Sequence, residues 1–143
     1  MDHEREELLY DFVETLRRLS RMKSFFASED LSLEEFMVLD LILESDGCSM
    51  KDIVNGLTIA ASTATGVVDR LVSRGLVERH HSERDRRKVI IELTRAGRQA
   101  HEKFRSEALA SVEDSVRHLS DDDIRFLIRI MKKVIEHSLN GRK

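Results

Sequence analysis

The chain has 143 residues, of which 36% are charged, with a formal net charge of −3 and one cysteine. This length suits one domain with a single core, so we expect a single domain over residues 1–143. No apolar run approaches the ~20 residues of a membrane helix, and a lone Cys48 excludes an internal disulfide framework. The acidic N-terminus does not fit a signal peptide, so we expect a cytoplasmic protein that does not enter a membrane.

The first third of the chain predicts three helices. Apolar residues at steps of three and four predict a helix from about Glu4 to Ala27. Ser32 and Glu35 form a capping-box pattern that begins a second helix, which ends near Gly47. Ser49 can cap a third, short helix.

The middle of the chain predicts a helix and a hairpin. A fourth helix should run from about Ala60 to Arg74, with Gly75 where a helix C-terminal glycine belongs. Two alternating segments, Leu76–His81 and Lys88–Leu93, then predict short strands joined by "SERDRR".

Two further helices should complete the fold. Thr94 can begin a long helix to about Leu119, and Ser120 with Asp123 can begin the last one. The predicted fold class is therefore mainly α with a small β-hairpin wing. Residues of about 32–94 have the order of a winged helix-turn-helix, flanked by helices at about 4–27 and 95–139.

The charge is unevenly distributed along the chain. Residues 60–95 hold eight basic and five acidic side chains, whereas the rest holds 16 basic and 22 acidic ones. A positive region on an acidic body can attract a polyanion, although most charged runs are simply solvated surface.

The fourth helix has the pattern of a DNA-recognition helix. Burying its apolar stripe leaves other faces with small hydroxyl residues, which let a helix enter the major groove, and with two arginines. The candidate contacts are Ser62, Thr63, Thr65, Arg70 and Arg74. In isolation, the same hydroxyls could merely sit near a helix cap.

The hairpin tip is the second candidate contact with double-stranded DNA. A narrow tip can enter the minor groove, where the negative potential attracts arginine. We expect Arg87 to read this groove with its guanidinium oriented by Asp85, while Arg84, Arg86 and Lys88 meet phosphates.

The run "TATGVVDRLVSRGLVERHHSERDRRKVIIELTRAGR" resembles the core of the MarR family of transcriptional regulators. The resemblance implies an obligate homodimer joined by the terminal helices and a pseudo-palindromic site. It assigns the major-groove role to the hydroxyl and arginine residues of the fourth helix, and the minor-groove role to Arg87 with Asp85. The sequence departs from the family at three positions: Thr58 replaces a glycine, Ala60 replaces a cap serine, and Gly66 replaces a basic residue. We expect Ser62 or Thr58 to cap the helix instead.

The terminal helices carry apolar stripes that a monomer would struggle to cover, which independently favours a homodimer over a monomeric bundle. The resemblance also implies a small aromatic or phenolic effector between these helices and the winged region. Its expected partners are Arg17 as the carboxylate ligand, with Leu33, Phe36, Met37 and Phe104 as apolar walls. A surface arginine beside ordinary core residues is the competing interpretation.

Other chemistries are poorly supported by the sequence. Some relatives sense hydroperoxides through a cysteine on the first helix, whereas Cys48 lies in a "DGCS" loop and is expected to be an incidental small residue. The six histidines form no ligand cluster, no cofactor is expected, and no enzyme motif appears. We expect a DNA-binding repressor; the alternative is a winged-helix module for protein–protein contact without sequence-specific DNA binding.

Overall fold

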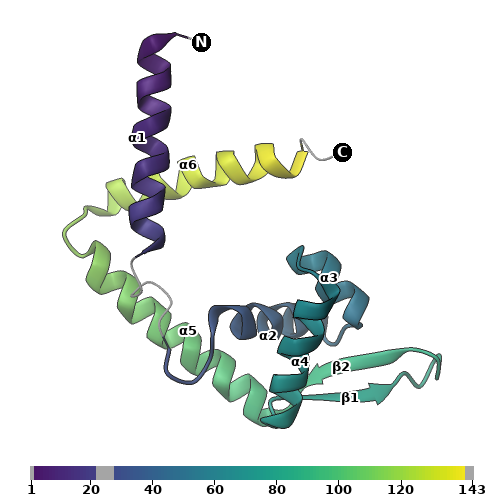
Figure 1. The fold of residues 1–143 in the computed structure, drawn as a ribbon. Helices are drawn as coiled ribbons and strands as arrows, with labels where there is room; N and C mark the ends of the chain where they lie inside the picture. Colours follow the sequence, from purple (N-terminus) through teal and green to yellow (C-terminus); the bar gives the residue numbers. More distant parts are fainter. Residues whose placement is uncertain (1, 22–27, 141–143) are drawn as a thin grey trace.

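The computed structural model describes residues 2–21 and 28–140, and its elements follow the predicted order (Figure 1). The elements are α1 (His3–Ser20), α2 (Leu33–Ser45), α3 (Met50–Leu57), α4 (Ala61–Ser73), β1 (Val77–His81), β2 (Val89–Leu93), α5 (Arg95–Val116) and α6 (Asp121–Asn140). The predicted end of the first helix, near Ala27, lies outside the described residues. The predicted class, mainly α with a hairpin wing, is confirmed.

Reciprocal caps fix where three helices begin. In each, a serine hydroxyl accepts the N–H of the residue three positions on, whose carboxylate accepts the serine N–H. These pairs are Ser32 with Glu35, Ser49 with Asp52, and Ser120 with Asp123. The predicted helix starts therefore follow from local hydrogen bonding.

The start of α4 differs from its prediction. The N-cap is Ala60, and no side chain caps the helix, so neither Ser62 nor Thr58 serves as the cap. Thr58 instead ends α3 in the left-handed region, with φ of 54°. A β-branched residue is unfavourable in that region, so the turn between α3 and α4 is strained where the family often has glycine.

The hydrophobic core lies in the winged region. Buried side chains come from α2, α3, α4, both strands and α5; the largest fully buried ones are Leu39, Ile42, Ile53, Leu71 and Ile91. Cys48 extends the hairpin, since it exchanges two backbone hydrogen bonds with Ile91 at 3.1 and 2.7 Å. The wing is thereby attached to the loop between α2 and α3.

The hairpin leads directly into α5. The two strands pair antiparallel from Val77↔Leu93 to His81↔Val89. Gly97, in the first turn of α5, packs so closely that an added Cβ would lie 1.9 Å from the Leu76 carbonyl oxygen. Only glycine fits there, which fixes the angle at which α5 leaves the wing.

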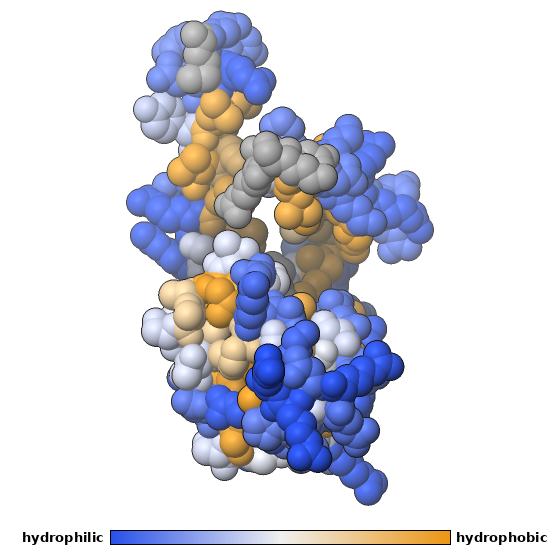
Figure 2. All heavy atoms as spheres, turned by 90° about the vertical axis from the view of Figure 1, so that its right-hand side faces the viewer, coloured by the Kyte–Doolittle hydropathy of each residue, from blue (hydrophilic) through white to orange (hydrophobic). Residues whose placement is uncertain are grey.

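The terminal helices stand apart from this core. α1 extends upward and α6 runs across the top of Figure 1, and no residue of α1 is buried. Figure 2 shows apolar side chains gathered on these upper helices, while the wing below is strongly hydrophilic. The exposed apolar residues include Leu9, Phe12, Leu16, Leu127, Met131, Val134 and Ile135. Within the described residues, no helix has the length and hydropathy to cross a membrane.

Candidate nucleic-acid interface

The helix α4 turns one face to the core and another to solvent. Ala64, Val67, Val68 and Leu71 are buried, whereas Ser62, Thr63 and Thr65 are exposed. The Thr65 hydroxyl donates to the Ala61 carbonyl at 2.9 Å, which leaves its lone pairs free to accept. Because no side chain caps α4, its first N–H groups are also available to an anion.

The two arginines of α4 are engaged with the protein itself. Glu35, only 7% exposed, accepts the Arg74 guanidinium at 3.1 Å and lies 3.5 Å from Arg70 Nε. Arg74 also donates to the Asp30 carbonyl oxygen at 2.5 Å. In the free protein, Arg74 therefore ties α4 to the start of α2, and a contact of either arginine with DNA remains a prediction.

A third ion pair, which the sequence did not indicate, joins α4 to the wing. Arg79 on β1 donates to the Asp69 carboxylate at 2.5 Å. Together with the Glu35 contacts, it fixes α4 against both α2 and β1. These three ion pairs hold α4 and the wing in one arrangement.

The wing tip is a turn built around Asp85. The Ser82 N–H donates to the Lys88 carbonyl at 2.9 Å, and the Lys88 N–H donates to the Asp85 carbonyl at 2.9 Å. The Asp85 carboxylate accepts the backbone N–H of Arg87 at 3.1 Å. This is the local turn in which an aspartate side chain replaces a backbone acceptor.

That geometry corrects the expected contact between Asp85 and the Arg87 guanidinium. Within residues 2–21 and 28–140, Asp85 forms no ion pair with any arginine. In this conformation the carboxylate contacts the backbone of Arg87 rather than its guanidinium. Asp85 therefore shapes the backbone that carries Arg87.

The basic side chains of the wing tip are available for a partner. Arg84, Arg86, Arg87 and Lys88 are all exposed, and none forms an ion pair with a described residue. By contrast, Arg70, Arg74 and Arg79 all have acidic partners. The strongest unpaired positive charge thus lies at the wing tip, which forms the deep blue front of Figure 2.

His80 on β1 adds a titratable group to the wing. His80 Nε2 lies 2.9 Å from the Glu92 carboxylate across the hairpin. The backbone carbonyl of His81, and then Glu92, raise the pKa of His80 above its ordinary 6.5. The charge of the wing therefore changes as pH passes through the raised pKa of His80.

The expected effector residues are only partly brought together. Phe36 stacks on Phe104 with ring centroids 4.3 Å apart and on His101 with centroids 4.9 Å apart. His101 Nε2 also lies 2.8 Å from the Asp40 carboxylate. Leu33 and Met37 remain exposed on α2, whereas Arg17 lies on α1, where its guanidinium binds Glu14 at 2.6 Å. The aromatic rings fill the space between α2 and α5.

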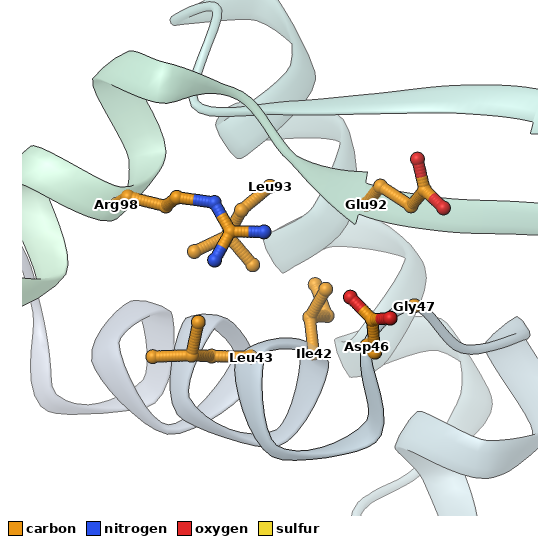
Figure 3. Close-up of a pocket in the computed structure, with 7 residues that line it drawn as sticks. All are labelled: Ile42, Leu43, Asp46, Gly47, Glu92, Leu93 and Arg98. Atoms are coloured by element: carbon orange, nitrogen blue, oxygen red, sulfur yellow. The ribbon is translucent and has the colours of Figure 1, made fainter.

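A small pocket lies elsewhere, between the end of α2, β2 and the start of α5. It has a volume of about 90 Å³ and is lined by Ile42, Leu43, Asp46, Gly47, Glu92, Leu93 and Arg98 (Figure 3). None of the five expected effector residues lines it. Its volume is too small for an aromatic acid, so it does not replace the expected site.

Cys48 is buried, with 3% of its surface exposed. Burial, and then the charge of Asp52, raise the pKa of its thiol to about 11. Since the thiolate is the reactive form, this cysteine is a poor nucleophile at neutral pH. Among the described residues, no three His, Cys, Asp or Glu side chains are arranged to hold a metal ion.

Comparison with known proteins agrees with this architecture. The model of the MarR family matches residues 31–89. The regulator MgrA of Staphylococcus aureus is 29% identical to this chain, and the match covers 97% of this chain and 94% of MgrA. Two solved structures share the fold. BldR of Sulfolobus solfataricus is 27% identical with a TM-score of 0.73, and the match covers 96% of this chain and 99% of BldR. BpsR of Bordetella bronchiseptica is 26% identical with a TM-score of 0.68, and the match covers 85% of this chain and 97% of BpsR. The DNA binding of BpsR is regulated by 6-hydroxynicotinic acid. Residues 31–89 thus carry the winged helix-turn-helix region of the MarR family, and over nearly its whole length the chain is similar to DNA-binding transcriptional regulators of this family.

Proposed function

We propose that the protein is a homodimeric, cytoplasmic repressor that binds a pseudo-palindromic operator and is released by a small aromatic or phenolic ligand. The observation that carries the DNA contact is the wing tip, where the exposed side chains of Arg84, Arg86, Arg87 and Lys88 form no ion pair with a described residue. An exposed cluster of unpaired cations is the surface that polyanionic DNA binds.

The helix α4 and the wing tip contact different grooves of the DNA. The exposed hydroxyls of Ser62, Thr63 and Thr65 enter the major groove, where they meet phosphates and base edges. Arg87 enters the neighbouring minor groove, carried by the turn at Asp85. Arg70 and Arg74 hold α4 in place through their ion pairs with Glu35. Arg70, whose side chain is half exposed, is the better placed of the two to contact a phosphate.

Dimerisation supplies a second copy of the DNA-binding surface formed by α4 and the wing. The apolar faces of α1 and α6 are exposed in one chain, and a second chain would cover them. A two-fold symmetric dimer then presents two copies of α4 to half-sites about 34 Å apart. A shift in this spacing would abolish binding.

The proposed ligand acts on this spacing from the region of the terminal helices. Its candidate partners remain Arg17, Leu33, Phe36, Met37 and Phe104, supported by the exposure of Leu33 and Met37 beside the aromatic stack. The regulation of BpsR by an aromatic acid supports the ligand class. The test is Arg17→Ala, which should remove the response to a panel of aromatic carboxylates, including 6-hydroxynicotinate, while leaving DNA affinity intact. An unchanged response would remove Arg17 from the site.

The first experiment is selection of bound duplexes from a random DNA pool, with the selected duplexes titrated at two salt concentrations. We expect a two-fold symmetric site with half-sites about one turn apart, and an affinity that falls steeply with salt. Selection of no sequence, with and without the aromatic panel, would favour a winged module for protein contact. Such an interface, with an apolar centre, would depend only weakly on salt.

A further inference from the structure

The pocket between the end of α2, β2 and the start of α5 is lined by charged groups of both signs. Arg98 reaches into it from α5, while Asp46 and Glu92 lie on the opposite side (Figure 3). Ile42 and Leu93, which also line the pocket, belong to the hydrophobic core. A few polar groups that converge beside apolar side chains are typical of a site for a small molecule.

The charged groups of this pocket are available to a ligand. Within the described part of the chain, neither Arg98 nor Asp46 forms an ion pair. Glu92 contacts His80 Nε2 through its Oε2 atom, at 2.9 Å. Its other oxygen, Oε1, would lie 3.3 Å from a Cβ added at Gly47, and therefore lies beside a residue that lines the pocket.

The turn at the end of α2 brings Asp46 to the same pocket as Glu92. Asp46 ends the helix in the left-handed region with φ of 51°, and Gly47 follows with φ of 99°. A Cβ at Gly47 would lie 3.1 Å from Glu92 Cγ, so the glycine lets this turn approach the wing closely. The two carboxylates are thus positioned by the backbone and by core packing.

The size and charge of the pocket limit what can bind. Its volume of about 90 Å³ is roughly that of three water molecules, at about 30 Å³ each in the liquid. A small anion would face two carboxylates, and a small cation would face the guanidinium, so a ligand of one sign meets a like charge. A small molecule that carries both an acid and an amine can pair with all three groups.

We propose that this pocket is a second ligand site, separate from the expected effector region, for a small zwitterionic amino acid whose carboxylate binds Arg98 and whose ammonium group binds Asp46 and Glu92. One such molecule would contact α2, the wing and α5 at once. It would therefore stabilise the arrangement in which α5 leaves the wing, beside the close contact of Gly97 with Leu76.

Calorimetric titration of the full chain tests the proposal. The probes are glycine, β-alanine and γ-aminobutyrate, in which the distance between the two charges increases. We expect at least one to bind at a single site with a dissociation constant of about 1 mM or below, and to raise the Tm as its concentration rises. Acetate and ethylammonium, which each carry one of the two charges, should bind at least about tenfold more weakly.

Matched variants identify the site. Arg98→Gln and Asp46→Asn should each weaken binding of the best probe about tenfold or more, because each removes a charged partner. Asparagine tolerates the left-handed conformation, so the second variant keeps the turn. Arg95→Gln, an exposed arginine in the same turn of α5, should leave the affinity within about twofold of the unaltered chain.

Three results would overturn the proposal. The first is the absence of both saturable heat and a rise in Tm with all three amino acids. The second is binding that survives both substitutions in the pocket, and the third is acetate or ethylammonium binding as tightly as the best amino acid. The titrations use no DNA, so their outcome is independent of whether the proposed operator is found.

Discussion

Glu35 and Arg74 form an ion pair between the first turn of α2 and the end of α4, with Glu35 Oε2 accepting from Arg74 Nη1 at 3.1 Å. The same carboxylate oxygen accepts the Ser32 N–H at 3.0 Å, so one buried side chain both caps α2 and anchors α4. The orientation of the recognition helix thus depends on the residue that starts a different helix.

Removing this carboxylate should destabilise the winged region. Glu35→Ala deletes half of a capping box and the acceptor of a charged hydrogen bond, so we expect a loss of about 2–3 kcal/mol in the free energy of unfolding. Chemical denaturation measures it. Glu34→Ala, an exposed neighbour in the same turn, is the control and should lower stability by less than about 1 kcal/mol.

Arg74→Ala should lower stability through the same contact, and should weaken DNA binding only as far as the folded fraction falls. Affinity measured well below the unfolding temperature separates the two effects. A large loss of affinity in Arg74→Ala that Glu35→Ala, also fully folded, does not share would show that Arg74 contacts DNA directly.

The turn at the wing tip can be tested with a matched pair of substitutions. Asp85→Ala removes the acceptor of the Arg87 N–H and should weaken DNA binding about threefold to tenfold, since a hydrogen bond contributes about 0.5–1.5 kcal/mol. Asp85→Asn keeps an acceptor oxygen and should bind DNA at least as well as the unaltered protein. If the asparagine variant is as weak as the alanine variant, the carboxylate charge matters, and Asp85 orients a guanidinium on DNA after all. Glu83→Gln controls for the lost charge.

Substitutions of Arg87 and of Arg84 should weaken DNA binding in different ways. Arg87→Ala should lower the affinity for the selected operator by about 1–3 kcal/mol and relax base preference at the minor-groove positions. Arg84→Ala should weaken all sequences alike and reduce the salt slope by about one. Titrations of the operator and of shuffled duplexes at several salt concentrations distinguish the two. Equal, sequence-independent losses would reduce Arg87 to a phosphate contact.

The contrast between these sites also explains what the sequence could and could not predict. The caps at Ser32, Ser49 and Ser120 depend on a partner three residues away, so a short pattern identifies them. The bond between Asp85 and the Arg87 N–H is equally local, and the tendency of aspartate to form such turns could have indicated it.

The ion pairs of Glu35 with Arg74 and of Asp69 with Arg79 were not predictable in this way. Helical periodicity separates buried from exposed faces, but it does not say which residues of two elements meet. Both pairs depend on how α4 crosses α2 and the wing. That angle is set by core packing and by close contacts such as Gly97 against Leu76.

Cys48 should be inert in the native protein. With a thiol pKa of about 11, only about one part in ten thousand is thiolate at pH 7. Alkylation by iodoacetamide should therefore require opening of the wing, and mild hydroperoxide should leave DNA affinity unchanged. Rapid stoichiometric labelling of the folded protein would contradict this. Cys48→Ala should lower stability by about 1 kcal/mol through the small cavity it leaves.

The wing should bind DNA more weakly as pH rises through the raised pKa of His80. The pKa of His80 is raised by the His81 carbonyl and by Glu92, so the contribution of protonated His80 to stability is complete below its ordinary 6.5 and is lost as pH rises through the raised value. Above that value, Glu92 keeps its charge without a cationic neighbour, which makes the wing less attractive to phosphate. Titration of operator affinity across this range should show the decline in the unaltered protein and in His81→Gln, but not in His80→Gln. A decline of the same size in His80→Gln would assign the pH dependence to another group.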